Sequence, residues 1–123
     1  MESLEKLNFW KDKKVLVTGH TGFKGTWLTI WLEKLGAKVI GFSLVEYPNS
    51  QFYQNTNVSS KITDCRGNIQ DLERLNQIFI EYNPEIVFHL AAQPLVRKSY
   101  DSPMDTIKTN ILGTTNVLEC IRK

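Results

Sequence analysis

Three glycines recur at three-residue intervals near the start of the chain, at Gly19, Gly22 and Gly25. They stand between a short apolar run at residues 15–17 and a stretch with apolar residues at helical spacing, residues 27–35. Glycine permits a tight turn and a close approach of backbone N–H groups to a phosphate, and the helix that follows presents its positive dipole end. The segment therefore predicts a nucleotide-binding loop that holds a diphosphate.

The spacing of these glycines departs from the commoner Gly-x-Gly-x-x-Gly pattern of dinucleotide-binding folds. It therefore indicates a Rossmann-like fold but not the usual dehydrogenase subtype. Purely structural turn glycines are the alternative interpretation. The strand before the loop and the helix after it favour phosphate binding, because that is the context the motif requires.

Apolar runs and helical stripes alternate along the rest of the chain, which is typical of a parallel sheet with crossover helices. We therefore predict an α/β fold, a Rossmann-like doubly wound parallel sheet of which only the N-terminal half, about four strands, is present. The predicted strands cover residues 15–18, 39–43, 62–66 and 86–90, and the first two predicted helices cover residues 23–35 and 72–82.

Two further stretches carry weaker signals. Residues 44–60 include Pro48 and many Asn, Ser and Thr with little periodicity, so we predict a surface loop. A last helix is expected after Ser102, whose side chain suits a cap, with Pro103 in its first turn. Its apolar residues are expected on one side: Ile107, Ile111, Leu118 and Ile121.

The chain of 123 residues is long enough for one domain with a core. In the predicted sheet the fourth strand would be an uncovered edge. We therefore interpret residues 1–123 as a truncated dinucleotide-binding domain, NAD(P)-binding and Rossmann-like, whose catalytic and substrate-binding part is absent.

Composition excludes several classes of function. Fifteen basic and thirteen acidic side chains give a net charge of +2, and no basic run is interleaved with aromatics, so we expect no nucleic-acid partner. The chain has no secretory signal pattern and no apolar stretch near the ~18 residues that span a bilayer, which predicts a cytoplasmic protein without a membrane partner. Cys65 and Cys120 are far apart and no histidines stand at ligand spacing, so we expect buried free thiols and no metal site.

Candidate cofactor-binding side chains lie within the glycine loop and after the second strand. Lys24 could neutralise a diphosphate and His20 could donate a hydrogen bond to it, but solvated loop residues are an equally good interpretation. Ser43 stands where dinucleotide enzymes usually place the acid that holds the adenosine ribose. With Glu46 three residues further on and no adjacent arginine, the sequence does not decide between NAD and NADP.

The segments after the third and fourth strands carry further candidates. Asn68 and Ile69 could contact an adenine, or could be a helix cap and a core residue. Leu90, Ala91, Ala92 and Gln93 end the fourth strand, where small residues let a ligand approach the backbone. His89 is better interpreted as a hydrogen-bonded core residue than as a catalyst. Further polar candidates are Arg97, which could clamp a phosphate, Lys98, Ser99, and Thr109 with Asn110 in the last helix, where Gly113 suggests tight packing.

Several of these segments together resemble the extended short-chain dehydrogenase/reductase family over nearly the whole chain. More narrowly, they are similar to its subgroup of CDP-glucose 4,6-dehydratases. The segments that carry the resemblance are residues 9–11, Phe-Trp-Lys; residues 19–25, Gly-His-Thr-Gly-Phe-Lys-Gly; residues 41–44, Gly-Phe-Ser-Leu; and residues 91–100, Ala-Ala-Gln-Pro-Leu-Val-Arg-Lys-Ser-Tyr.

The resemblance implies a cofactor and a reaction. NAD takes a hydride from carbon 4 of the sugar in CDP-glucose, water leaves across carbons 5 and 6, and the hydride returns to carbon 6. The family also implies a homo-oligomer for the full-length enzyme. Cofactor roles are implied for the loop, including Phe23, and for His20, Lys24, Ser43, Asn68, Ile69, Leu90 to Gln93 and Thr109, and substrate roles for Arg97 and Ser99.

One part of the family pattern is missing. Such enzymes use a Tyr-x-x-x-Lys pair, in which the lysine and the oxidised nicotinamide lower the pKa of the tyrosine. The residues four positions after Tyr47, Tyr53, Tyr82 and Tyr100 are Gln51, Asn57, Ile86 and Met104. We therefore assign no catalytic residue to this chain and expect the chain alone to be inactive.

Two alternatives remain open. Another extended short-chain epimerase or reductase acting on a different nucleotide sugar would share this first half. A non-catalytic dinucleotide-binding module, whose exposed sheet edge docks a partner, would carry the same loop.

Overall fold

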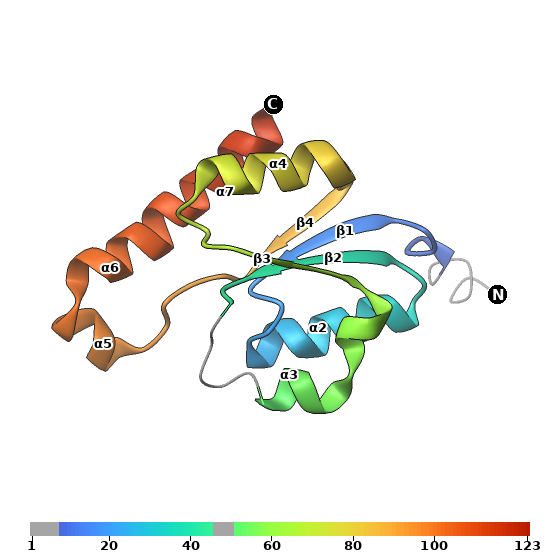
Figure 1. Cartoon of the computed structure of the whole chain (residues 1–123), viewed down its shortest axis with the longest axis horizontal. Coiled ribbons are helices and arrows are strands. Elements are labelled where there is room, and N and C mark those ends of the chain that lie inside the picture. The colour runs from blue at the N-terminus through green and yellow to red at the C-terminus, as the bar shows by residue number, and fades with distance from the viewer. Residues whose placement is uncertain (1–7, 46–50) are drawn as a thin grey trace.

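The computed structural model describes residues 8–45 and 51–123, and it contains a parallel sheet of four strands. The order of the strands is β3-β2-β1-β4, so β1 lies in the centre and the chain crosses over from one side of the sheet to the other (Figure 1). This order confirms the predicted Rossmann-like half. The strands are β1 (Lys14–Thr18), β2 (Lys38–Ser43), β3 (Thr63–Arg66) and β4 (Ile86–His89).

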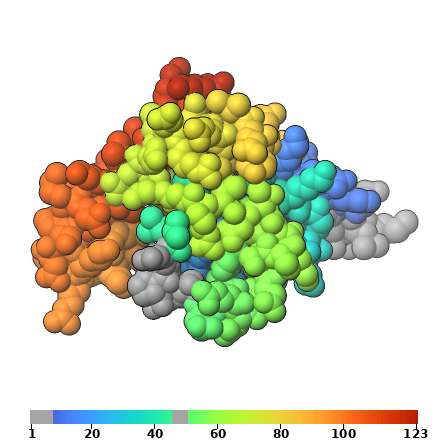
Figure 2. Space-filling model, in the orientation of Figure 1, coloured from blue at the N-terminus to red at the C-terminus, as the bar shows by residue number. Residues whose placement is uncertain are grey.

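Helices cover both faces of this sheet (Figure 1). On one face lie α2 (Phe23–Lys34) and α3 (Gln51–Thr56), and on the other lie α4 (Leu72–Tyr82) and α7 (Gly113–Arg122). Two short helices, α5 (Val96–Asp101) and α6 (Pro103–Ile107), stand to one side of the molecule, in orange in Figures 1 and 2. Within the described residues, no helix is both long and apolar enough to cross a membrane.

The core has two halves because side chains of a strand alternate between the faces of the sheet. Val15 and Val17 of the central strand pack with Leu32 on the side of α2, whereas Leu16 packs with Leu75 of α4 on the other side. All three β1 side chains are 0% exposed, as expected for the central strand of a parallel sheet that is covered on both faces.

Helix α2 packs on the sheet through its threonines and not through its tryptophans. Trp27 and Trp31 are 55% and 65% exposed, whereas Thr26 and Thr29 are fully buried. The two threonine hydroxyls donate to backbone oxygens of His20 and Gly25, so their burial leaves no polar group unpaired. Small side chains on the inner face let the helix lie close to the sheet.

The predicted surface loop at residues 44–60 is wrong for residues 51–60, whereas residues 44–45 are exposed and irregular as predicted. Residues 51–56 form α3, and a 3₁₀ turn follows at Val58–Lys61. Tyr53 and Val58 are each only 3% exposed. Six- and four-residue elements are too short to show a periodic pattern, which explains why sequence reasoning missed them. Glu46, Tyr47 and Pro48 lie outside the described residues.

The last part of the chain was expected to form one helix, but it forms several shorter helical segments. The unpredicted α5 precedes Ser102, whose side chain makes no cap bond, although Pro103 does open α6. Between α6 and α7 the backbone makes a π-helical turn at Lys108–Leu112. A π turn holds one extra residue and therefore rotates every following side chain around the helix. The residues of the expected apolar stripe are all exposed, at Ile107, Ile111, Leu118 and Ile121, and α7 buries Asn116, Val117 and Cys120.

Candidate functional site

The glycine loop begins with a backbone conformation that favours glycine. Gly19 has φ +73°, and its N–H donates to the carbonyl of Phe42 at 2.8 Å, which ties the loop to β2. A Cβ at this position would lie 2.8 Å from the backbone nitrogen of Ala91. Gly19 therefore lets the segment after β4 pack directly against the loop.

The third glycine closes the loop from the helix side. A Cβ on Gly25 would lie 2.0 Å from the backbone oxygen of Gly19, so no other residue fits without moving the loop. Gly22 is different, because its Cβ would meet only that same oxygen at 3.4 Å. Gly22 also starts α2 without a capping side chain, so the first-turn N–H groups of this helix have no side-chain partner there. Such a helix start suits an anion.

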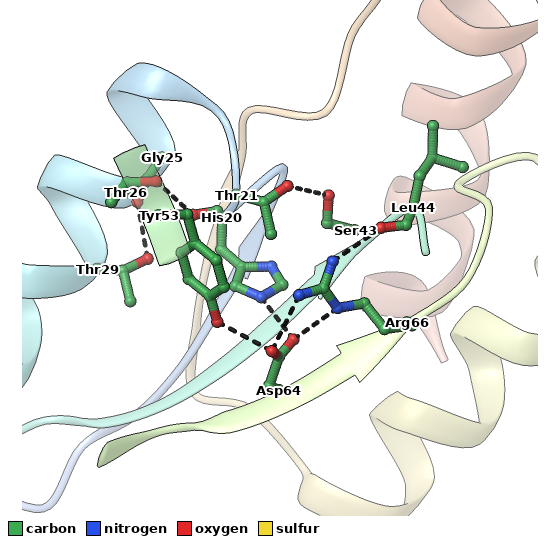
Figure 3. Close-up of polar contacts among 10 residues, drawn as sticks. All are labelled: His20, Thr21, Gly25, Thr26, Thr29, Ser43, Leu44, Tyr53, Asp64 and Arg66. Atoms are coloured by element: carbon green, nitrogen blue, oxygen red, sulfur yellow. Dashed lines mark hydrogen bonds and ion pairs between the residues drawn. The ribbon is translucent and has the colours of Figure 1, made fainter. Parts of the chain in front are cut away.

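A polar cluster lies directly beneath the loop (Figure 3), in which His20 and Tyr53 are buried and Asp64 and Arg66 are partly exposed. Asp64 of β3 accepts from His20 at 2.8 Å and from the Tyr53 hydroxyl at 3.0 Å, and it accepts two bonds from Arg66 at 3.0 and 3.1 Å. The His20 ring is 0% exposed and stands edge-on to the ring of Tyr53. It also fills the space above Gly41, where a Cβ would lie 2.3 Å from the imidazole. The cluster thus joins the loop, β2, β3 and α3.

The charge state of the cluster follows from its surroundings. Burial alone would raise the pKa of Asp64, but hydrogen bonds from Arg66 and His20 outweigh it and leave that pKa below its ordinary value. Burial is the largest effect on His20 and leaves its pKa below the ordinary 6.5. His20 is therefore neutral at pH 7, and its Nε2–H donates to an ionised Asp64. Burial and the neighbouring carboxylate raise the pKa of Tyr53, so its hydroxyl keeps its proton.

This geometry gives His20 a different set of contacts from those that the sequence suggested. Its Nε2 is taken by Asp64, and its Nδ1 is buried without a hydrogen-bond partner among the described residues. The His20 side chain therefore supports the loop from below. Lys24 and Phe23 are exposed in the first turn of α2, and Phe23 packs against Phe52 with tilted rings whose centroids lie 5.7 Å apart.

The protonation of histidine predicts how stability depends on pH. The pKa values of both His20 and His89 are lowered by burial from 6.5, so the unfolded chain takes up these protons at a higher pH than the folded chain does. The free energy of unfolding should therefore fall as the pH drops through about 6.5 toward 5. Urea unfolding at a series of pH values measures this, and His20→Gln should reduce the slope. A free energy of unfolding that stays constant over this range would contradict the prediction.

A second network organises the end of β4. The Thr18 hydroxyl meets His89 Nδ1 at 2.7 Å and accepts from the backbone N–H groups of Leu90 at 3.0 Å and Ala91 at 3.2 Å. His89 Nε2 reaches the hydroxyl of Thr114 in α7 at 3.0 Å. His89 is thus hydrogen-bonded through both ring nitrogens, the structural role that the sequence favoured. The network fixes the segment 90–93 at the carboxyl edge of the sheet, beside the glycine loop.

Gln93 and Asn110 lock this segment to the last helices. The Gln93 N–H donates to Asn110 Oδ1 at 2.7 Å, and Asn110 Nδ2 donates back to the Gln93 carbonyl at 3.1 Å. Gln93 is 9% exposed, and its amide also bonds Leu95 and Thr106. Asn110 and Thr109 stand in the π-helical turn, where Thr109 accepts from Gln70 at 3.1 Å. Turns of this kind are frequent at functional sites.

The residues after β3 take structural positions. Asn68 accepts from the Gln70 N–H and forms a local turn, while Asp71, not Asn68, caps α4 by accepting from Arg74. Ile69 is 5% exposed and lies where a Cβ on Gly113 would meet it at 2.7 Å, which confirms the tight packing predicted there.

The two candidate substrate residues lie further along the same edge. Arg97 is exposed in the first turn of α5, and the Ser99 hydroxyl donates to the Val96 carbonyl in the same helix. Lys98 pairs with Asp105 at 3.6 Å, both side chains being about half exposed. No described contact joins Arg97 or Ser99 to the glycine loop, although the segment after β4 runs from the loop to α5 (Figure 1).

Sequence reasoning missed several residues that build the site. Asp64, Arg66 and Tyr53 stand far from the glycine loop in sequence and match no motif. Only the pairing of strands brings Asp64 and Arg66 beneath the loop, opposite Gly41 and Ser43 of β2. The expected absence of a metal site remains a prediction, and among the described residues no group of three potential ligands is found.

The glycine loop and its neighbourhood match known proteins. A model for a family described as GDP-mannose 4,6 dehydratase matches residues 16–123. A CDP-glucose 4,6-dehydratase of Salmonella typhimurium is 45% identical over 116 residues, which cover 94% of this chain and 32% of that protein. The chain thus spans about a third of the length of this relative.

Solved structures agree with the fold. A UDP-glucose 4-epimerase of Thermotoga maritima, crystallised with UDP-glucose, is 34% identical with a TM-score of 0.78, over 87% of this chain and 33% of that one. A UDP-glucose 4-epimerase of Thermus thermophilus in complex with NAD is 32% identical with a TM-score of 0.77, over 89% of this chain and 33% of that one.

Proposed function

The chain belongs to the GDP-mannose 4,6 dehydratase family of extended short-chain dehydrogenases/reductases, and from this we propose that it holds NAD as the cofactor-binding part of a nucleotide-sugar 4,6-dehydratase. The observation that carries the proposal is the loop in which Cβ atoms at Gly19 and Gly25 would collide with backbone. That bare cradle, at the start of α2, fits a diphosphate.

Different residues around the cradle contact different parts of the dinucleotide. The loop from Gly19 to Gly25 takes the diphosphate through backbone N–H groups other than those of Gly19 and Gly22, which bond the carbonyls of Phe42 and Gly19. The exposed ammonium of Lys24 adds a positive charge. Ser43 lies at the ribose of the adenosine, and Asn68 and Ile69 at the adenine. The nicotinamide half lies along Leu90, Ala91, Ala92 and Gln93, with Thr109 behind them.

The chemistry divides between cofactor and protein. NAD, when bound, supplies a hydride acceptor for an alcohol of the sugar. This chain fixes the geometry, because the networks of Thr18 and Gln93 hold the backbone of residues 90–93 against the loop. Because Gly19 and Ala91 are in close contact, the ends of β1 and β4 that would hold the dinucleotide pack directly against each other.

The substrate we propose is CDP-glucose, converted to CDP-4-keto-6-deoxyglucose. The support is the 45% identity to a CDP-glucose 4,6-dehydratase, against 34% for the UDP-glucose 4-epimerase structure over a similar part of the chain. Arg97 and Ser99 on α5 are the residues of this chain that we assign to the nucleotide sugar, the arginine as a bidentate phosphate partner.

We expect the 123-residue chain on its own to form no CDP-4-keto-6-deoxyglucose. No tyrosine in it has a lysine four residues later, so the acid/base pair of such enzymes is missing. Incubating the purified chain with NAD and CDP-glucose and following the keto sugar by its ultraviolet absorbance in alkali tests this. Turnover by this chain would contradict the expectation that it lacks a catalytic acid/base pair.

NAD binding is the direct test of the proposed site. Isothermal titration calorimetry of the 123-residue chain with NAD should give saturable binding with one site per chain. Proton resonances of the amides of residues 19–25 should shift on titration, whereas those of α7 should not. Saturable binding that leaves the loop resonances unchanged, or no binding by a chain with a cooperative unfolding transition, would contradict the proposal.

A further inference from the structure

The strand pairing places an arginine beside Ser43, the residue that we assign to the adenosine ribose. Ser43 and Arg66 are partners in the parallel register of β2 and β3, so their side chains stand on the same face of the sheet. Arg66 Nη1 donates to the carbonyl of Leu44 at 2.9 Å, just beyond the end of β2. Figure 3 shows the guanidinium between Asp64 and the end of β2 that carries Ser43 and Leu44. The sequence alone showed no arginine near Ser43.

The guanidinium is held firmly but retains unused donors. Two of its N–H groups bond Asp64 and one bonds Leu44. Arginine has five N–H donors, so these bonds to described residues leave two. The Arg66 side chain is 31% exposed, so an anion arriving from solvent could reach them.

Two hydroxyls complete the same edge. The hydroxyls of Thr21, in the glycine loop, and of Ser43 lie 2.7 Å apart. Either oxygen can be the donor, so one hydroxyl hydrogen remains free for a ligand. Dinucleotide-binding folds that select NAD place a carboxylate here, which bonds the 2′-hydroxyl and repels a 2′-phosphate. Among the described residues the end of β2 carries no such carboxylate. The nearby Asp64 of β3 is bonded to His20, Tyr53 and Arg66.

We propose that Thr21, Ser43 and Arg66 form a subsite for a phosphomonoester on the 2′-oxygen of the adenosine ribose, so that the chain accepts NADP as well as NAD. The inference rests on the proposed function, since it requires a dinucleotide whose diphosphate lies on the glycine loop. A nearby arginine is the usual means by which such folds accommodate the 2′-phosphate.

The charge balance sets the size of the effect. Arg66 is already paired with the ionised Asp64, so the edge is close to neutral and does not attract a phosphate as an isolated arginine would. Two free donors and a hydroxyl compensate for the lost hydration of the phosphate without a large surplus. We therefore expect Kd values for NAD and NADP that agree within about tenfold, where a carboxylate at residue 43 would separate them by about a hundredfold or more.

The test compares NAD with NADP on the 123-residue chain and on four variants by calorimetric titration. Arg66→Gln should weaken NADP about tenfold and NAD less than about twofold, because only NADP carries the phosphate that the guanidinium contacts. Arg66→Lys keeps the positive charge but not the paired N–H donors of the guanidinium. Its affinity for NADP should lie between those of the unchanged chain and Arg66→Gln. Ser43→Asp should weaken NADP about a hundredfold and leave NAD binding in place. Arg122→Gln, which removes a remote charge paired with Glu119, should change neither.

The outcomes separate this inference from the proposed function. Binding of NAD with NADP more than about a hundredfold weaker would overturn the 2′-phosphate subsite and leave the proposed function intact. Equal losses for NAD and NADP in Arg66→Gln would also overturn it, because Arg66 would then act only through the fold. Thermal unfolding of each variant shows whether it is folded. If Arg66→Gln is unfolded, the Kd values of Arg66→Lys and Ser43→Asp for NAD and NADP decide whether the subsite exists. Failure of both dinucleotides to bind the folded chain would overturn the proposed function and the subsite together.

Discussion

Replacing Gly25 by alanine is expected to weaken NAD binding by about a hundredfold or more. The added Cβ would lie 2.0 Å from the backbone oxygen of Gly19, and backbone cannot yield as a flexible side chain can. The loop must therefore open, and its N–H groups lose their positions around the diphosphate. Losing two charge-assisted hydrogen bonds costs about 3 kcal/mol, which corresponds to that factor. Calorimetric titration with NAD measures the change.

Gly22→Ala is the matched control for this variant. It adds the same methyl group to the same loop, but the new Cβ would meet its nearest neighbour at 3.4 Å. The backbone of Gly22 has φ −72°, which alanine adopts without strain. We expect a loss of less than about tenfold. Equal losses at Gly22 and Gly25 would show that the shape of the loop is not what limits binding.

Replacing Asp64 by alanine is expected to lower the free energy of unfolding by about 3 kcal/mol. One carboxylate satisfies His20, Tyr53 and Arg66, and its removal leaves all three donors without that partner. His20 is 0% exposed, so water cannot replace the lost bond without a rearrangement. Leaving a buried hydrogen-bond donor unsatisfied costs about 1–3 kcal/mol, and Asp64 serves two buried donors, His20 and Tyr53, which together account for the expected loss. Urea unfolding at pH 7.5 measures the change.

Two variants control for trivial causes. Asp64→Asn keeps the shape and part of the hydrogen bonding, so its loss should be smaller than that of alanine. Asp105→Ala removes a carboxylate whose pair with Lys98 is about half exposed on both sides, and should change stability by less than about 0.5 kcal/mol. A loss at Asp64 no larger than at Asp105 would mean that the cluster beneath the loop does not support the fold.

The sheet could be predicted from sequence because its strands are short and apolar and their ends carry turn residues. Val15, Leu16 and Val17 read as a buried strand and are buried on both faces. The glycine loop was predictable for the same reason, since its signal is local. The broken last helix was not, because a π turn leaves no compositional trace and shifts the buried face by one residue.

The candidate site was predictable only where its residues follow one another in the chain. Gly19 and Gly25 can be recognised in the sequence by their spacing, whereas Asp64 and Arg66 are brought to the loop by the register of two parallel strands. Register depends on long-range pairing, and a shift of one residue would turn Arg66 to the other face of the sheet. For that reason the sequence left the choice of dinucleotide open at Ser43, and the structure supplied the arginine that bears on it.

The imidazole of His20 above Gly41 couples two amino-acid choices that lie 21 positions apart. A side chain at residue 41 is incompatible with the present position of the His20 ring, because a Cβ there would lie 2.3 Å from it. Across evolution the two positions should therefore change together: a homologue that carries a small residue at the first is free to carry alanine or valine at the second. Substitutions at either position are then epistatic, and their effects on folding will not add.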